Sequence, residues 1–128
     1  MRAVHSYAYF NQTWSEPTSA QQSARTPDVD HPLVRTHPAT SAKAIYADPG
    51  MTVGIIGMSK EESRALLDRL FEHCLQPAFR YDHVWNPGDV LMWDNASTMH
   101  RRGKFDPSSE RLMKRTTILP DPNNAIPL

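Results

Sequence analysis

Cysteine, surplus charge and long apolar runs are all scarce in this chain. Cys74 is the single cysteine among 128 residues, so no disulfide can form within the chain, as is usual for a reducing compartment. The 14 Lys and Arg residues balance 14 Asp and Glu residues. This balance argues against nucleic acid or an anionic membrane as a partner, because both favour a basic excess.

Targeting signals and several common catalytic motifs are also absent. No apolar run approaches the length that crosses a bilayer, and the N-terminus lacks the basic and apolar regions of a signal peptide. The sequence has no Gly-rich phosphate loop, zinc-type Cys/His spacing or Gly-x-Ser-x-Gly motif. We therefore expect a soluble cytoplasmic protein with no membrane partner.

The composition along the chain predicts one domain with irregular ends. Residues 1–30 are expected to be irregular, because residues 11–30 are rich in Ser, Thr, Gln and Pro, and residues 5–10 are a candidate short strand. We place the main domain at residues 31–119 and a tail at 120–128. Within the domain, extended segments are predicted at residues 31–38, 44–47 and 52–56.

The clearest predicted element is a helix that begins at Ser59. Ser59 and Glu62 form a capping box, in which the hydroxyl accepts from a backbone N–H and the glutamate reaches back to the start of the helix. The residues that follow repeat with helical period and predict one buried face. This face comprises Leu66, Leu67, Leu70, Phe71, Cys74 and Leu75.

After the helix, the pattern alternates as it does in strands. Residues 79–85 alternate in polarity, and Asn86-Pro87-Gly88-Asp89 is a typical tight turn. Further strands are predicted at residues 90–93, 98–102 and 112–119. A helix followed by such strands favours a mainly β, α+β fold, in which part of an antiparallel sandwich or barrel carries the helix outside.

His100, Arg111 and Arg115 are the candidate site residues. His100 follows an apolar strand, which suits either a metal ligand at the mouth of a small barrel or a histidine on a polar surface. Arg111 and Arg115 are four residues apart, so a strand would place both on one face. There they could bind a carboxylate in a pocket or pair with neighbouring acids on a solvated face. Of the other histidines, we expect His73 to be exposed and His83 to be packed.

Several motifs together resemble a known family. Trp93-Asp94-Asn95-x-x-Thr98-x-His100, followed by Arg111-x-x-x-Arg115-Thr116-Thr117, is similar to the C-terminal part of the TauD/TfdA family. Residues 31–38, the Ser59 helix and Trp85-x-Pro87-Gly88-Asp89-Val90 match that family in the same order. Its members are Fe(II)- and 2-oxoglutarate-dependent dioxygenases that act on taurine and on chlorophenoxyacetates. The resemblance covers residues 31–117.

The resemblance implies a double-stranded β-helix (jelly-roll) fold and a role for each candidate residue. His100 would be the distal iron ligand of a two-histidine, one-carboxylate site. Arg111 would bind the distal carboxylate of 2-oxoglutarate, and Arg115 would lie beside it and help to hold an acidic substrate. Fe(II) would be the cofactor and 2-oxoglutarate the co-substrate for hydroxylation of a small carboxylate or sulfonate.

The chain departs from the family pattern at two points. Ala96 stands where the family usually has arginine, and no His-x-Asp or His-x-Glu pair occurs anywhere in the sequence. We expect those ligands and the N-terminal barrel strands to come from sequence before Met1, and the chain alone to be inactive. The alternative hypothesis is a non-catalytic remnant or interaction module. Strands that lack neighbours would expose edges through which the chain could oligomerise.

Overall fold

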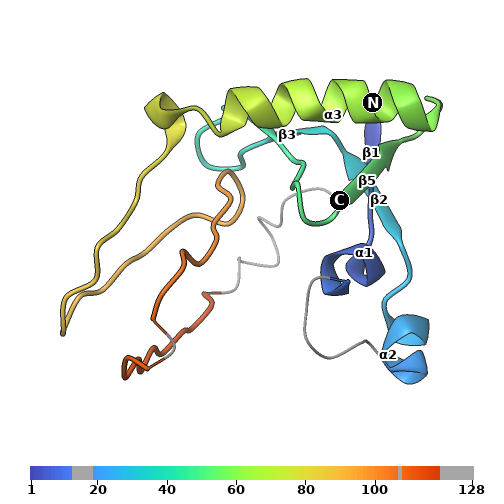
Figure 1. Ribbon diagram of the computed structural model, residues 1–128. Helices are drawn as coiled ribbons and strands as arrows, with labels where there is room; N and C mark the ends of the chain where they lie inside the picture. The colour runs from blue at the N-terminus through green and yellow to red at the C-terminus, as the bar shows by residue number, and fades with distance from the viewer. Residues whose placement is uncertain (13–18, 107, 119–128) are drawn as a thin grey trace.

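The structure, a computed structural model, describes residues 1–12, 19–106 and 108–118 and consists of short strands with one long helix (Figure 1). No helix in this part of the chain is long and apolar enough to cross a membrane. The elements in chain order are β1 (Arg2–His5), α1 (Tyr7–Asn11), α2 (Ala20–Arg25), β2 (Val29–Pro32), β3 (Val34–Thr36), β4 (Lys43–Ile45), β5 (Thr52–Ile55), α3 (Lys60–Cys74) and a 3-10 turn, η1 (Pro77–Phe79).

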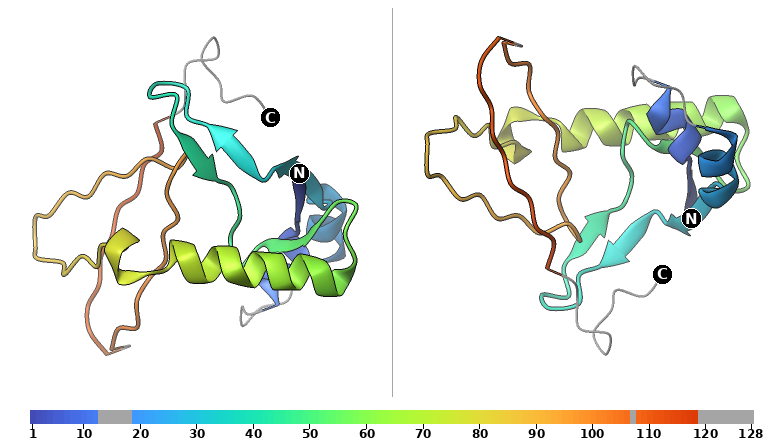
Figure 2. Two further views of the ribbon diagram at one scale, coloured as in Figure 1. Left: turned by 90° about the horizontal axis from the view of Figure 1, so that it is seen from above. Right: turned by 90° about the horizontal axis from the view of Figure 1, so that it is seen from below.

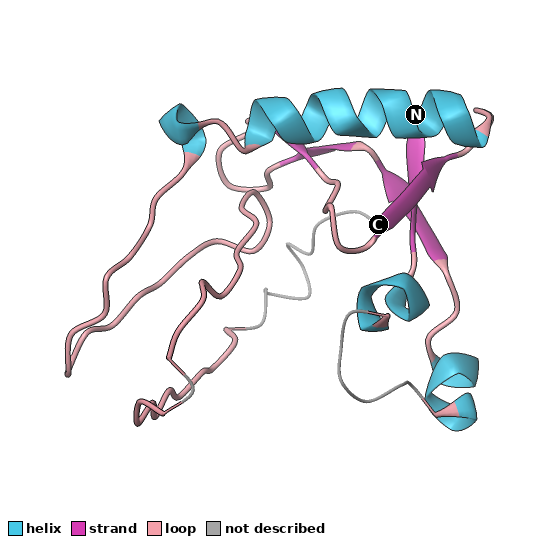
Figure 3. Cartoon of the chain, viewed as in Figure 1, coloured by secondary structure: helices cyan, strands magenta, loops and turns pink. Residues whose placement is uncertain are grey.

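The described strands form two small antiparallel sheets (Figure 3). The first has the order β2-β1-β5, so the N-terminal strand is central, with Ala3 opposite both His31 and Ile55. The register shifts between Val4 and His5 on the β5 side, which places His5 opposite Thr52. The second sheet is the β3–β4 hairpin, and both of its strands had been expected from the sequence to be extended.

Helix α3 covers the three-stranded sheet and begins as the sequence predicts. The Ser59 hydroxyl accepts from the Glu62 N–H at 3.2 Å, and the Glu62 carboxylate accepts from the Ser59 N–H at 2.9 Å. The Ser63 hydroxyl accepts from the Ile55 N–H at 3.0 Å, which ties the helix to β5. The buried core that results comprises Ala3, Leu33, Ala47, Ile55, Leu67 and Phe71, with Ile45, Leu66 and Leu70 packed against it. The predicted face is therefore correct except at its end, where Leu75 is exposed.

The N-terminal residues contain more regular structure than the sequence indicates. The expected strand at residues 5–10 is wrong, because His5 ends β1 and the next residues form α1. Ser6 is the N-cap of this helix, and its hydroxyl accepts from the Tyr9 N–H at 3.3 Å. Strand β1 pairs with β2 and β5, which lie far along the chain, so its existence depends on contacts that no local pattern reveals.

The strands expected after the helix are the main correction to the sequence analysis. Among the described residues from 80 to 118, none is in a strand, and the segment forms long loops beside the sheets (Figures 1 and 2). The predicted turn is present, since the Asp89 N–H donates to the Asn86 carbonyl at 3.1 Å and Gly88 has φ +92. A strand needs a neighbouring strand for its backbone groups. The alternating pattern alone does not supply that neighbour.

Candidate functional site

Trp93 brings two of the three predicted site residues together. The indole ring lies 4.8 Å from the His100 imidazole, measured between ring centroids. The Arg115 guanidinium lies 5.6 Å from the centroid of the same indole. The Trp93 indole N–H donates to the Asn95 side-chain oxygen at 2.8 Å, which orients the ring. His100 and Arg115 therefore share one aromatic neighbour although they are separated in the sequence.

Arg111 lies on a different aromatic ring. Its guanidinium is 5.3 Å from the centroid of Phe105, and the guanidinium of Arg102 is 4.8 Å from the same centroid. The expectation that Arg111 and Arg115 share one face of a strand is not met, because residues 112–118 are not in a strand. The structure instead gathers two cations, Arg102 and Arg111, around one ring, where each gains from cation–π attraction.

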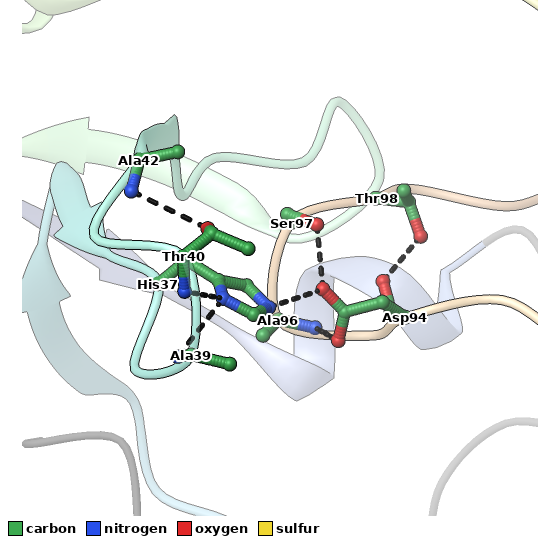
Figure 4. A network of polar contacts seen from close by, with 8 residues as sticks. All are labelled: His37, Ala39, Thr40, Ala42, Asp94, Ala96, Ser97 and Thr98. Carbon is green, nitrogen blue, oxygen red and sulfur yellow. Dashed lines mark hydrogen bonds and ion pairs between the residues drawn. The ribbon is translucent and has the colours of Figure 1, made fainter.

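Asp94 organises the turn that precedes His100, as Figure 4 shows. Its carboxylate accepts from the Ala96 N–H at 3.0 Å and from the Ser97 hydroxyl at 2.6 Å, and its carbonyl accepts from the Thr98 N–H at 3.1 Å. The bonds to the carboxylate lower the pKa of Asp94, with the Ser97 hydroxyl as the largest cause and the Ala96 N–H next, while burial acts in the opposite direction and His37 has a smaller lowering effect. Asp94 therefore stays ionised to a lower pH than an ordinary aspartate does.

His37 contacts this turn from the β3–β4 hairpin, and the sequence analysis had given it no role. Its Nε2 lies 2.9 Å from the Asp94 carboxylate (Figure 4). Its Nδ1 accepts from the Ala39 and Thr40 N–H groups at 3.2 and 3.1 Å. In the neutral ring the proton is therefore on Nε2, and this N–H donates a hydrogen bond to Asp94. The only sequence feature that points to His37 is its place before Pro38 and a short polar turn. Nothing in the neighbouring residues indicates that Asp94 is its partner.

The two expectations for other histidines are confirmed. His73 is exposed on α3. His83 is partly buried, with its ring 4.5 Å from Trp85, and it joins Tyr81 to Asp89 through contacts of 2.9 and 3.1 Å. The Asp89 carboxylate also accepts from the Asn86 N–H, which is the largest cause of its lowered pKa.

The residues that the structure describes do not form a complete metal centre. Across residues 1–12, 19–106 and 108–118, no group of three His, Cys, Asp or Glu side chains is arranged to hold an ion. The contacts of His100 are aromatic rather than acidic. A facial site of two histidines and one carboxylate needs three protein ligands. The described residues therefore offer one candidate ligand and do not by themselves fit the ion.

Comparison with protein families and characterised proteins gives a consistent answer. The family described as "Taurine catabolism dioxygenase TauD, TfdA family" matches residues 1–117. The chain is 37% identical over 93 residues to pentalenolactone F synthase of Streptomyces arenae, which is 72% of this chain and 31% of that protein. It is 39% identical over 104 residues to the alpha-ketoglutarate-dependent 2,4-dichlorophenoxyacetate dioxygenase of Cupriavidus pinatubonensis, which is 81% of this chain and 36% of that protein. The chain thus spans about a third of the length of these relatives.

Solved structures agree with the sequence relatives. AAD-2, crystallised in complex with Mn(II) and N-oxalylglycine, is similar with a TM-score of 0.73 and 36% identity, over 85% of this chain and 43% of that chain. A second structure, of a putative alpha-ketoglutarate dependent 2,4-D dioxygenase from Burkholderia xenovorans, gives a TM-score of 0.61 and 26% identity, over 66% of this chain and 33% of that chain. With its motifs, its helix–sheet arrangement and these matches in agreement, the chain belongs to the TauD/TfdA family of dioxygenases.

Proposed function

We propose that this chain is the C-terminal portion of an Fe(II)- and 2-oxoglutarate-dependent dioxygenase and supplies part of its active site. The match of residues 1–117 to the family carries the proposal. The joint placement of His100 and Arg115 at Trp93 supports it, since a ligand and a substrate-binding cation should be close to one another. The similarity to AAD-2, which was crystallised with Mn(II) and N-oxalylglycine, supports a metal and 2-oxoglutarate as its cofactor and co-substrate.

The proposed roles follow the family motif residue by residue. His100 is the distal iron ligand, and Arg111, eleven residues later, binds the distal carboxylate of 2-oxoglutarate. A guanidinium suits this task because it makes two parallel, charge-assisted hydrogen bonds to a carboxylate. In the completed protein, the strands that the sequence predicts after α3 would join a jelly roll, and iron with 2-oxoglutarate would supply the oxidising chemistry.

Arg115 points to the class of substrate. It shares Trp93 with His100, so a group that pairs with its guanidinium lies close to the ligand histidine. A small organic acid, a carboxylate or a sulfonate, fits this cation. The similarity to a 2,4-dichlorophenoxyacetate dioxygenase is in keeping with a carboxylate. The cytoplasmic location expected from the sequence stays a prediction.

The chain alone should not catalyse the 2-oxoglutarate-dependent reaction. One imidazole cannot hold ferrous iron in a facial site, because two further protein ligands supply most of the geometry and the neutralising charge. We expect the purified chain, given Fe(II), 2-oxoglutarate and candidate acids, to form no more succinate than free iron does. Robust succinate release that is lost in a His100→Ala variant would show that the chain completes its own metal site.

A hybrid protein separates this proposal from the alternative of a non-catalytic remnant. The N-terminal portion of the Cupriavidus relative would be joined to this chain at the start of their match. The hybrid should form succinate in an acid-dependent reaction, and His100→Ala should abolish it. His73→Ala, a change at an exposed histidine of α3, is the matched control and should leave the reaction intact. A folded hybrid without succinate formation would favour the remnant.

A further inference from the structure

A long-range contact joins the folded sheets to the segment that carries the proposed site. His37 and Asp94 are 57 residues apart in the sequence, and their side chains meet at 2.9 Å. The His37 side chain is 17% exposed, whereas that of Asp94 is 46% exposed, so the histidine is largely shielded from water and the carboxylate is open to it. A contact with one solvated partner has a modest effect, which a local measurement can detect.

The hairpin holds His37 in place before it meets Asp94. The His37 N–H donates to the Ala42 carbonyl at 2.8 Å, and the His37 carbonyl accepts from the Ser41 N–H at 2.9 Å. Two further N–H groups, of Ala39 and Thr40, donate to its Nδ1. With the backbone and one ring nitrogen fixed by its own turn, the ring has only Nε2–H left for a distant partner, and that group reaches Asp94 (Figure 4).

Asp94 transmits this position to the residues on either side. Its hydrogen bonds to Ala96, Ser97 and Thr98 close the turn that ends two residues before His100. Trp93 precedes it and contacts the His100 ring at 4.8 Å. A displacement of Asp94 would therefore move both the turn and the aromatic ring against which His100 lies.

We infer that His37 is a positioning residue, which anchors the Asp94 turn to the β3–β4 hairpin and thereby sets the place of Trp93 and His100. This inference takes the role of His100 from the proposed function and adds the residue that holds its turn. His37 itself touches neither metal nor substrate in this assignment. The contact that it makes is a property of this chain and can be measured without iron.

The test uses the full chain labelled with ¹⁵N and two substitutions of His37. His37→Ala removes the donor, whereas His37→Gln places an amide N–H near the position of Nε2. NMR would follow solvent exchange at the Ala96 and Thr98 amides and the chemical shift of the Trp93 indole N–H. In His37→Ala we expect the two amides to exchange roughly threefold to fivefold faster and the indole resonance to shift. His37→Gln should restore most of the original values.

Controls separate positioning from a general loss of stability. Amides of α3 and β1 should exchange at unchanged rates in both variants, and His73→Ala should alter none of the reporter signals. Unchanged exchange in His37→Ala, an equal change throughout the sheet, or no rescue by His37→Gln would each overturn the inference. The NMR measurement needs no iron, so its result does not depend on the activity of the hybrid protein. An inactive hybrid would leave a positive NMR result valid, and an active hybrid would not reverse a negative one.

Discussion

At the scale of single residues, the cluster of His5, His31 and Tyr46 is the most unusual feature of the folded core. The three rings lie 5.3–5.5 Å from one another, and His5 is only 8% exposed. The His5 Nε2 and His31 Nδ1 atoms are buried without a hydrogen-bond partner within the part of the chain that the structure describes. Burial is the main cause that lowers the pKa of His5, followed by repulsion from His31, while Asp48 acts in the opposite direction.

This cluster predicts that mild acid destabilises the fold. The folded state lowers the pKa of His5, so below about pH 6.5 the unfolded chain binds a proton that the folded chain resists. The stability contributed by neutral His5 is therefore complete above that pH and is lost as pH falls. We expect the urea midpoint to drop between pH 7.5 and 5.5, a range well above the titration of ordinary carboxylates at about pH 4.

Substitution of His5 identifies the source of this pH dependence. In His5→Asn, the drop between the two pH values should shrink, because the titrating group is gone, whatever the absolute stability of the variant. His73→Asn, at the exposed histidine on α3, should keep the original drop. An equal drop in all three proteins would show that His5 does not control it.

Arg111 gives a second prediction at this scale, to be tested in the hybrid protein. Removing one partner of a buried charge pair costs about 2–5 kcal/mol, so Arg111→Ala should weaken 2-oxoglutarate binding more than tenfold. Arg115→Ala should mainly weaken binding of the acidic substrate. Arg102→Ala is the matched control, because Arg102 and Arg111 lie over the same Phe105 ring. Equal dissociation constants for 2-oxoglutarate in the parent and Arg111→Ala proteins would refute the assignment.

At the scale of elements, α3 shows how far local pattern can predict structure. Its capping box and its apolar repeat involve residues no more than four positions apart, and both are found as expected. The sequence did not indicate that Ser63 would be buried, at 3% exposure, on the same face as Leu67. Its hydroxyl is there because the Ile55 N–H of β5 needs an acceptor, and that need arises only when helix and strand meet.

The buried face of α3 can be tested with a pair of alanine substitutions. Leu67 is 3% exposed in the core, so Leu67→Ala should leave a cavity and cost about 2–5 kcal/mol of unfolding free energy. Arg69→Ala, on the exposed side of the same helix, should stay within about 0.5 kcal/mol. Urea unfolding at neutral pH measures both. Similar losses in the two variants would mean that the face of the helix is misassigned.

At the scale of the whole molecule, the segment after η1 carries a large share of the exposed apolar surface. Val84, Val90, Leu112 and Ile118 are 82%, 90%, 88% and 78% exposed. Apolar side chains this exposed bury little surface within the chain, which leaves them available for contact with another chain. The sequence pattern assigns these same residues to strands. Their apolar side chains are exposed because the segment pairs with no neighbouring strand among the described residues.

We therefore expect the chain to associate as its concentration rises. Sedimentation velocity over a range of concentrations should show species larger than the monomer, and Val90→Ser combined with Leu112→Ser should shift the distribution toward monomer. Ile56→Ser is the control, since Ile56 is 55% exposed but lies outside this segment. A monomer at every concentration, or an equal effect of the control, would contradict the prediction.

Local chemistry and motif were enough to predict some features of this protein. The capped helix, the Pro87-Gly88 turn and each short motif of the family depend on residues within a few positions, so they can be read in the sequence itself. The identity of His100, Arg111 and Arg115 as candidates came from the same source. The aromatic rings beside these residues could not be predicted in this way. Trp93 and Phe105 lie against them only because of the path that the loops take.

Contacts between distant segments were decided by the tertiary structure alone. The central place of β1 requires β2 and β5 on its two sides, and the burial of His5 follows from that pairing. The partner of His37 lies 57 residues away, beyond any local pattern. The described residues from 80 to 118 show the converse, since an alternating sequence forms loops there and no strand pairing. A helix satisfies its own backbone within one turn, whereas a strand exists only when another strand lies beside it.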